Sequence, residues 1–277
     1  MVPSAENVTT PESVPQVLVR IHSIVRRRLA GGPGGSPAGI NLRGHSQQWF
    51  DVAADEVIAE ELRACFPDGE MLSEESGLQS LGNGSPRWRF LVDPVDGSDN
   101  HSRKLPLSAV SIAVLEAEGP LAPDRVHWAM VGSLDEDCPL TATKNLGCRQ
   151  GEEAVSVSKV RALGDAFVSC ELSHHAPTGR LATVLSRARS VRSYGCASRA
   201  LALVARGALD AHIDVRDRLT AESFLAAAFL VQEAGGYALD LDGHGFQHLK
   251  DLHSTTRIVV AATVELAEEI AKELGEL

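Results

Sequence analysis

The spacing of apolar side chains predicts that the chain alternates between helices and strands. Apolar residues recur at three- and four-residue intervals over 14–25 and again over 54–66, which predicts two amphipathic helices in the first quarter. Pro67-Asp68-Gly69 ends the second of them. The apolar run "WRFLVD" (88–93) predicts a buried strand, and "AVSIAVL" (109–115) predicts another.

The second half of the chain continues this alternation. Strands are expected at 165–172 and 208–214 and in "TRIVVAAT" (256–263), and 121–160 is expected to hold short strands and turns. Helices are expected at 178–189, at 197–207, at 221–236 before a Gly-Gly stop, and at 264–274. Alternating elements predict a layered α/β (α+β) architecture. We place a domain boundary near residue 150, between an N-terminal α+β domain (1–150) and a C-terminal α/β domain (151–277).

One segment lacks any periodic pattern. "GGPGGSPAG" (31–39) is expected to break all regular structure. It lacks the Gly-Lys-Ser/Thr ending of a P-loop, so we interpret it as an ordinary loop and not as a nucleotide site.

Charge and composition narrow the classes of function. Lys and Arg number 26 and Asp and Glu 37, which gives a net charge of −11 and argues against a nucleic-acid partner. The excess acid serves either solubility or cation binding, and only the positions of the carboxylates separate the two. No apolar run is long enough to span a membrane, and the first 16 residues lack the pattern of a secretory signal. An odd, scattered set of five cysteines fits reduced thiols, so we expect a cytoplasmic protein.

The stretch "LVDPVDGSDN" (91–100) carries the most specific chemistry. Asp93 is expected to end an apolar strand, Pro94 fixes the chain direction, and Gly97 permits a tight turn that brings Asp96 back toward Asp93. Such a turn offers two carboxylates, the carbonyl of Val95 and an anion-facing backbone, the oxygen ligands that Mg²⁺ prefers. An ordinary Asx turn is the alternative. The Asp-x-Asp nucleophile motif of haloacid-dehalogenase phosphatases is excluded, because the spacing here is one residue longer.

Further carboxylates strengthen the cation interpretation. Asp51 begins the second predicted helix, and Glu74 lies in "MLSEESG" (71–77) just upstream of the Asp-rich turn. Each of these stands at the end of an element, where sites are usually built. Together with Asp93 and Asp96 they could hold two or three divalent ions.

These motifs resemble the magnesium-dependent, lithium-sensitive phosphatases that include inositol monophosphatase and the archaeal-type fructose-1,6-bisphosphatases. The resemblance covers roughly residues 15–277 and rests on Asp93-Pro94-Val95-Asp96-Gly97-Ser98-Asp99-Asn100, Glu74-Glu75-Ser76, Asp51 and Glu233-Ala234-Gly235-Gly236. It implies a layered α-β-α-β-α sandwich of the sugar-phosphatase type. It also implies hydrolysis of a phosphate monoester on a small polyol, sugar or cyclitol, with Mg²⁺ or Mn²⁺ as cofactor. A phosphorylated small molecule is the implied partner, without nucleic acid or membrane, and a homodimer is expected.

The resemblance assigns a role to each matching residue. Glu74, Asp93 and the Val95 carbonyl would hold one metal ion, and Asp93 and Asp96 a second. Asp51 and Ser98 would be catalytic with Glu74, orienting and deprotonating the attacking water. The substrate would contact the amides of Gly97 and Ser98, the run Gly195-Cys196-Ala197, and Asp214.

One position departs from the family pattern. The family places an aspartate ten residues before the glutamate of Glu-Ala-Gly-Gly, where this chain has Ser223, a neutral and weak ligand. Glu222 could compensate, although adjacent helical residues point about 100° apart. Either Glu222 or substrate completes the site of a working phosphatase, or the scaffold performs another task on a phosphorylated small molecule or only binds it.

Two other groups of residues leave alternatives open. Arg192 and Arg218 either bind a second phosphate or form surface ion pairs. His244 and His248 lie four residues apart but without an acidic ligand pattern, so a loop is favoured over a zinc site.

Overall fold

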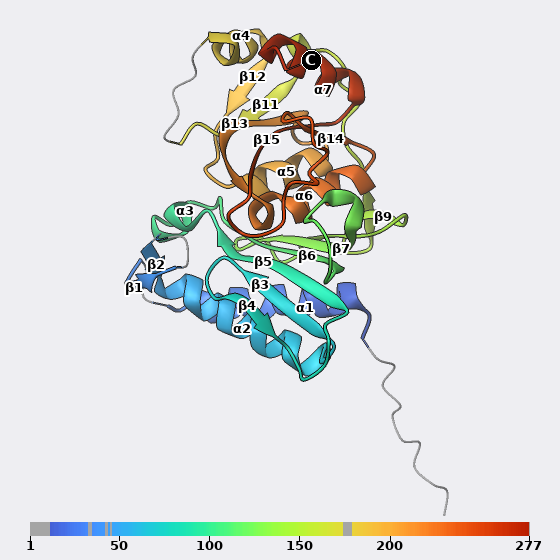
Figure 1. The fold of residues 1–277 in the computed structure, drawn as a ribbon. Coiled ribbons are helices and arrows are strands. Elements are labelled where there is room, and N and C mark those ends of the chain that lie inside the picture. The colour runs from blue at the N-terminus through green and yellow to red at the C-terminus, as the bar shows by residue number, and fades with distance from the viewer. Residues whose placement is uncertain (1–11, 33–34, 42–43, 45, 174–178, 277) are drawn as a thin grey trace, which may run out of the picture.

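The computed structural model arranges the chain in five layers, helix–sheet–helix–sheet–helix (Figure 1). It describes residues 12–32, 35–41, 44, 46–173 and 179–276. Three apolar cores fill the spaces between neighbouring layers. The predicted layered sandwich is therefore confirmed. None of the described helices is long and apolar enough to cross a membrane.

The first helical layer contains α1 (Val14–Leu29) and α2 (Trp49–Cys65), as the apolar spacing predicts. Leu18 and Ile58 are fully buried against the outer face of the first sheet and belong to the same apolar core as Phe90. Burial of such side chains stabilises the fold by about 1.5–3 kcal/mol each. This layer fixes the start of α2, and so the position of Asp51.

The first sheet has eight strands in the order β10-β9-β8-β7-β6-β5-β3-β4. β3 and β5 run parallel, and the other neighbouring pairs are antiparallel. The strands are β3 (Gly69–Ser73), β4 (Gly77–Ser80), β5 (Trp88–Asp96), β6 (Ala109–Glu116), β7 (Val126–Ser133), β8 (Leu140–Thr143), β9 (Gly147–Gln150) and β10 (Glu153–Val155). The central strands β5 and β6 are buried along nearly their whole length because helices cover both faces.

The middle layer consists of α5 (Ala197–Ala205) and α6 (Ala221–Glu233), and it packs between the two sheets. α6 is buried almost all round, which explains its run of alanine, leucine and phenylalanine without a polar face. Phe224, for example, joins the same core as Leu91 of β5. The largest core therefore mixes residues from both halves of the chain.

The second sheet has five strands in the order β12-β11-β13-β15-β14. They are β11 (Phe167–Cys170), β12 (Ser190–Arg192), β13 (Ala211–Thr220), β14 (Tyr237–Asp240) and β15 (Thr255–Ala261). The outer layer above it holds α4 (Gly179–Arg187) and α7 (Val264–Leu274). The first sheet ends at Val155 and the second begins at Phe167. The domain boundary near residue 150 stays a prediction, because the shared core runs across it.

The remaining elements are short. β1 (Pro37–Ile40) and β2 (Ser46–Gln48) form a two-stranded sheet beside the start of α2, α3 (Ser98–Ser102) follows β5, and single 3-10 turns span Pro123–Arg125 and Leu163–Asp165. The prediction that 31–39 breaks all regular structure is thus wrong for Pro37–Gly39. This strand forms through backbone pairing with β2, and all its residues are exposed, so no pattern of apolar residues predicts it.

Candidate active site

The site begins at an irregularity in β5. Asp93 pairs with Ser111 and Asp96 with Ala109, so Pro94 and Val95 lie opposite Val110 alone. This extra residue makes a β-bulge, where the missing N–H of proline is tolerated. The prediction that Asp93 ends the strand is wrong, because pairing resumes at Asp96. The bulge leaves the two carboxylates close enough for Asp96 to raise the pKa of Asp93.

The turn after β5 depends on glycine. Gly97 has a φ of 83°, and a Cβ there would lie 2.9 Å from the Leu107 carbonyl and 3.0 Å from Cβ of Cys196. The chain then enters α3, from which the Asn100 amide donates to the carbonyls of Leu107 at 3.0 Å and Tyr194 at 2.7 Å. Asn100 thereby fastens the Asp-rich turn to the loop that leads into α5.

Asp96 faces the first turn of α5. Its carboxylate accepts the backbone N–H of Ser198 at 2.7 Å and the Cys196 thiol at 3.2 Å. Burial raises the pKa of Asp96 to about 6, although these donors lower it. Partly positive amides at a helix N-terminus favour the ionised carboxylate, so Asp96 is held ready as an anion at neutral pH.

Asp51 occupies the third position of α2 and is buried. It accepts the Gln48 N–H at 2.8 Å and the Ser98 hydroxyl at 3.0 Å. The same hydroxyl lies 3.0 Å from the Val95 carbonyl, so its single proton serves either acceptor. Burial raises the pKa of Asp51 to about 6, near the value that suits a general base at neutral pH.

Two glutamates follow β3. The Asn41 amide lies 3.5 Å from Glu74, and the Gln47 amide donates to Glu75 at 2.7 Å. Burial, together with nearby carboxylates, raises the pKa of Glu75 to about 7. Glu75 was not among the predicted site residues, although its place beside Glu74 in the motif was a usable signal.

These residues meet at two adjoining cavities. The smaller, of about 260 Å³, is lined by ten of the predicted site residues: Glu74, Asp93, Val95, Asp96, Gly97, Ser98, Gly195, Cys196, Ala197 and Ser223. The larger, of about 1130 Å³, shares Glu74, Gly97, Ser98 and Gly195 with it and adds Asp51 and Glu75. Segments far apart in the sequence therefore converge on one space.

Two predicted residues lie outside both linings. Glu222 is buried, and its carboxylate accepts the Thr220 hydroxyl at 2.6 Å. Asp214 is fully buried and takes a bidentate contact from Arg216, with Nε at 3.0 Å and Nη2 at 2.7 Å. Arg216 itself lines both cavities. Sequence reasoning missed this arginine, which the polar run "RDR" (216–218), between the predicted strand 208–214 and the predicted helix 221–236, could have signalled.

The donor set fits a hard divalent cation. Asp93 is buried, and its pKa is raised well above the usual range by burial and by Asp96, Glu74 and Glu222. The Ser223 hydroxyl donates to Asp93 at 3.2 Å from the position where an acidic ligand was expected. Crowded carboxylates beside the Val95 carbonyl provide oxygen ligands and mutual repulsion that a cation would relieve.

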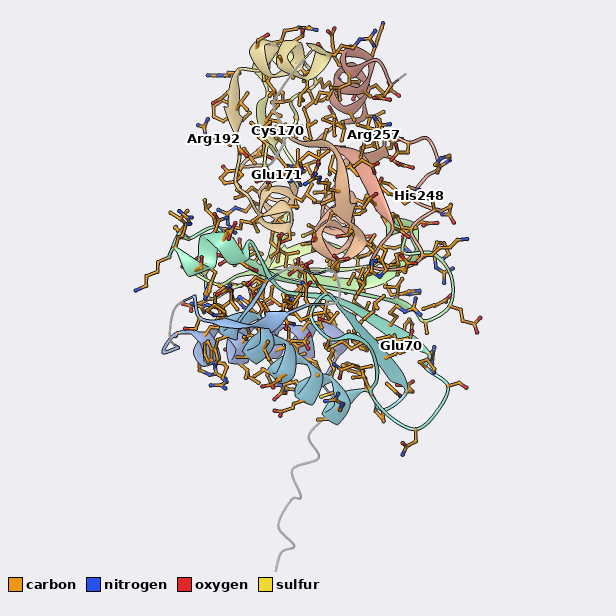
Figure 2. All side chains as sticks on the ribbon, turned by 60° about the vertical axis from the view of Figure 1, so that its left-hand side comes forward. Glu70, Cys170, Glu171, Arg192, His248 and Arg257 are labelled. Carbon is orange, nitrogen blue, oxygen red and sulfur yellow. The ribbon has the colours of Figure 1, made fainter. Side chains whose placement is uncertain are left out.

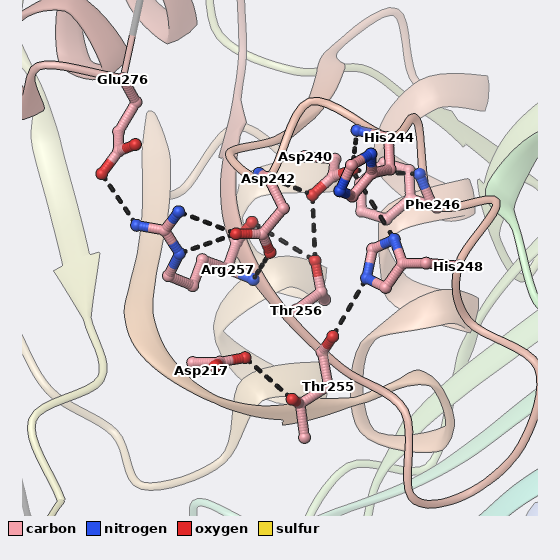
Figure 3. A network of polar contacts seen from close by, with 10 residues as sticks. All are labelled: Asp217, Asp240, Asp242, His244, Phe246, His248, Thr255, Thr256, Arg257 and Glu276. Carbon is pink, nitrogen blue, oxygen red and sulfur yellow. Dashed lines mark hydrogen bonds and ion pairs between the residues drawn. The ribbon is translucent and has the colours of Figure 1, made fainter.

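A second acidic group lies far along the chain, at the last residue of β14 and in the segment that follows it (Figure 3). Ligand atoms of Asp240, Asp242 and His248 lie within 4.8 Å of one another. However, the Asp240 carboxylate already accepts three backbone N–H groups and the Thr256 hydroxyl, and Asp242 binds Arg257. Asp240 and Asp242 therefore stabilise the loop 240–256 through hydrogen bonds and an ion pair within this part of the protein.

Comparisons with known proteins agree with this geometry. The model of the inositol monophosphatase family matches residues 45–277. Inositol monophosphatase 1 of Xenopus laevis is 31% identical over 236 residues, covering 81% of this chain and 78% of that protein. The fructose-1,6-bisphosphatase/inositol-1-monophosphatase of Methanothermobacter thermautotrophicus is 26% identical over 267 residues, covering 93% and 95%.

Solved structures share the fold. The extragenic suppressor protein suhB from Bartonella henselae superposes with a TM-score of 0.80 at 24% identity, covering 95% of this chain and 98% of that one. A family match over most of the chain, with the motif carboxylates gathered at one cavity, leads to one conclusion: the chain belongs to the inositol monophosphatase family.

Proposed function

We propose that this protein is a Mg²⁺-dependent phosphatase that hydrolyses a phosphate monoester on a small polyol, sugar or cyclitol. Members of its family are magnesium-dependent phosphomonoesterases that bind phosphorylated small molecules. The observation that carries the proposal is the convergence of Glu74, Asp93 and Asp96 on one small cavity. Ser98, whose hydroxyl donates to the buried Asp51, lines the same cavity.

The chain's own groups divide the work. Asp51, held by Gln48 and Ser98, accepts a proton from the attacking water. The water oxygen bonds to phosphorus as the ester P–O bond breaks. The departing alkoxide takes up a proton from solvent and leaves as the alcohol, inorganic phosphate follows, and Asp51 returns its proton to solvent. The backbone amides of Gly97 and Ser98 bind phosphate oxygens, and the run 195–197 contacts the hydroxyls of the leaving group.

Glu74, Asp93, Asp96 and the Val95 carbonyl would hold Mg²⁺. Bound there, the ion supplies charge to neutralise phosphate oxygens and lowers the pKa of a coordinated water. Ser223 contributes a neutral oxygen to this set.

Phosphate release tests the proposal directly. The protein with Mg²⁺ is expected to release inorganic phosphate from at least one of inositol 1-phosphate, fructose 1,6-bisphosphate and adenosine 3′,5′-bisphosphate, and EDTA is expected to stop it. Asp51→Asn keeps the shape and the acceptor for Gln48 but removes the base, so kcat should fall about 100-fold or more. Asp68→Asn on the exposed surface is the matched control.

Because Ser223 places a neutral hydroxyl where an acidic ligand was expected, a second candidate function is binding of a phosphorylated small molecule without hydrolysis. Absence of phosphate release with either Mg²⁺ or Mn²⁺, together with calorimetric binding of the same compounds, would overturn the phosphatase in its favour.

A further inference from the structure

A second irregular strand contributes residues to both cavities. β13 pairs with β15 at Asp214↔Ile258 and again at Leu219↔Thr256, so the four residues 215–218 lie opposite the single residue Arg257. We call 215–218 the β13 bulge. Bulges of this kind re-aim side chains next to sites.

The β13 bulge is anchored at both ends. Asp214 grips Arg216 through two guanidinium nitrogens, and Glu171 lies 3.9 Å from the same guanidinium. Asp217, with a φ of 54°, accepts the Thr255 hydroxyl at 2.8 Å (Figure 3). The backbone of the bulge is therefore held in place.

Arg218 is the member of the bulge whose charge is not compensated. No hydrogen bond or ion pair to another described residue accounts for its guanidinium, whereas Arg216 is held by Asp214 and Asp217 by Thr255. Arg218 is exposed and lines both cavities, as do Thr220, Ser98 and Glu74. A guanidinium without a partner beside a phosphate site is suited to bidentate contact with a second anion.

The other arginine suggested by the sequence lies elsewhere. Arg192 projects from the edge strand of the second sheet (Figure 2), donates to Ser190 and to the Val191 carbonyl, and lines neither cavity. It therefore serves as a control for Arg218.

We propose that Arg218, supported by Arg216 on the β13 bulge, selects substrates that carry a second anionic group besides the phosphate to be cleaved. The group is a phosphate or a carboxylate on the same small molecule. This inference rests on the proposed phosphatase function and names the substrate class of that site. Arg218 acts as a specificity residue, and its contact lies away from the ester bond that breaks.

Matched substrates test the second anion. Fructose 1,6-bisphosphate is compared with fructose 1-phosphate and fructose 6-phosphate, and 6-phosphogluconate with sorbitol 6-phosphate, which replaces the carboxylate by a hydroxymethyl group. The wild type should have a higher kcat/KM for fructose 1,6-bisphosphate or for 6-phosphogluconate than for the corresponding singly anionic compounds. A preference for the bisphosphate identifies the second anion as a phosphate, and a preference for 6-phosphogluconate identifies it as a carboxylate. Arg218→Ala should lower kcat/KM for the preferred compound about tenfold more than for its singly anionic counterpart, mainly through KM. Arg218→Lys should recover part of the loss, and Arg192→Ala should change neither value.

Two results would overturn the inference while leaving the phosphatase intact. In one, Arg218→Ala lowers kcat/KM equally for the doubly anionic compounds and for their singly anionic counterparts. In the other, Arg218→Ala leaves kcat/KM unchanged for all of them. If no compound is hydrolysed, calorimetric binding of fructose 1,6-bisphosphate in the presence of Mg²⁺ tests the role of Arg218 separately from catalysis. Binding that weakens about tenfold in Arg218→Ala supports it, and binding that is absent or insensitive to the variant overturns it.

Discussion

At the scale of single residues, Ser223 has the largest consequence for the metal site. Its hydroxyl lies 3.2 Å from Asp93, so an aspartate there would add another carboxylate beside Asp93 in the same cavity. Ser223→Asp should raise Mg²⁺ affinity and lower the Mg²⁺ concentration for half-maximal phosphate release about tenfold. Without metal it should be less stable than the wild type, because two buried carboxylates repel each other.

The neutral variant Ser223→Asn separates charge from shape. It should leave Mg²⁺ affinity, measured by calorimetry, close to that of the wild type. A Ser223→Asp variant with unchanged or weaker Mg²⁺ binding would mean that position 223 lies outside the metal site.

At the scale of elements, the turn from β5 into α3 depends on Gly97. Alanine there meets both the unfavourable φ of 83° and the Leu107 carbonyl 2.9 Å away. Gly97→Ala should cost about 1–3 kcal/mol of the free energy of unfolding and lower Tm by several degrees. Gly164→Ala is the matched control, since a Cβ there meets nothing within 4 Å. Equal Tm values for the two variants, measured by calorimetry, would contradict the argument.

Elements also mark the limit of what sequence could predict. The helix α2 was predictable because one-sided burial imposes a period on its apolar residues. The helix α6 and the strand β6, which are buried on nearly all sides, were predictable from nearly unbroken apolar runs. The two bulges that shape the site were not, since a bulge is defined by pairing with another strand. Asp214 shows the effect: the resemblance predicted a substrate contact, but its carboxylate lies buried against Arg216, which the bulge brings to the cavity.

At the scale of the whole molecule, a cluster of buried and half-buried acids has folded-state pKa values above the ordinary values. The pKa is about 6 for Asp51 and Asp96 and about 7 for Glu75, against ordinary values of 3.8 and 4.5, and the pKa of Asp93 is also raised. A raised pKa means that the folded state binds more protons than the unfolded state between the two values. The stability that these groups contribute is therefore complete below about pH 4 and is lost as pH rises to about 7.

Magnesium should reverse this loss over the same interval. Binding requires ionised carboxylates, so the stabilisation by a fixed Mg²⁺ concentration should grow between about pH 5 and pH 7.5. The measurement is Tm with and without Mg²⁺ at each pH, because the difference cancels titrating groups remote from the site, such as Asp240. Asp93→Asn should flatten the difference, since it removes the carboxylate that both proposed metal positions share. If Mg²⁺ raises Tm by the same amount at about pH 5 and about pH 7.5, or still raises it in Asp93→Asn, the ion binds elsewhere.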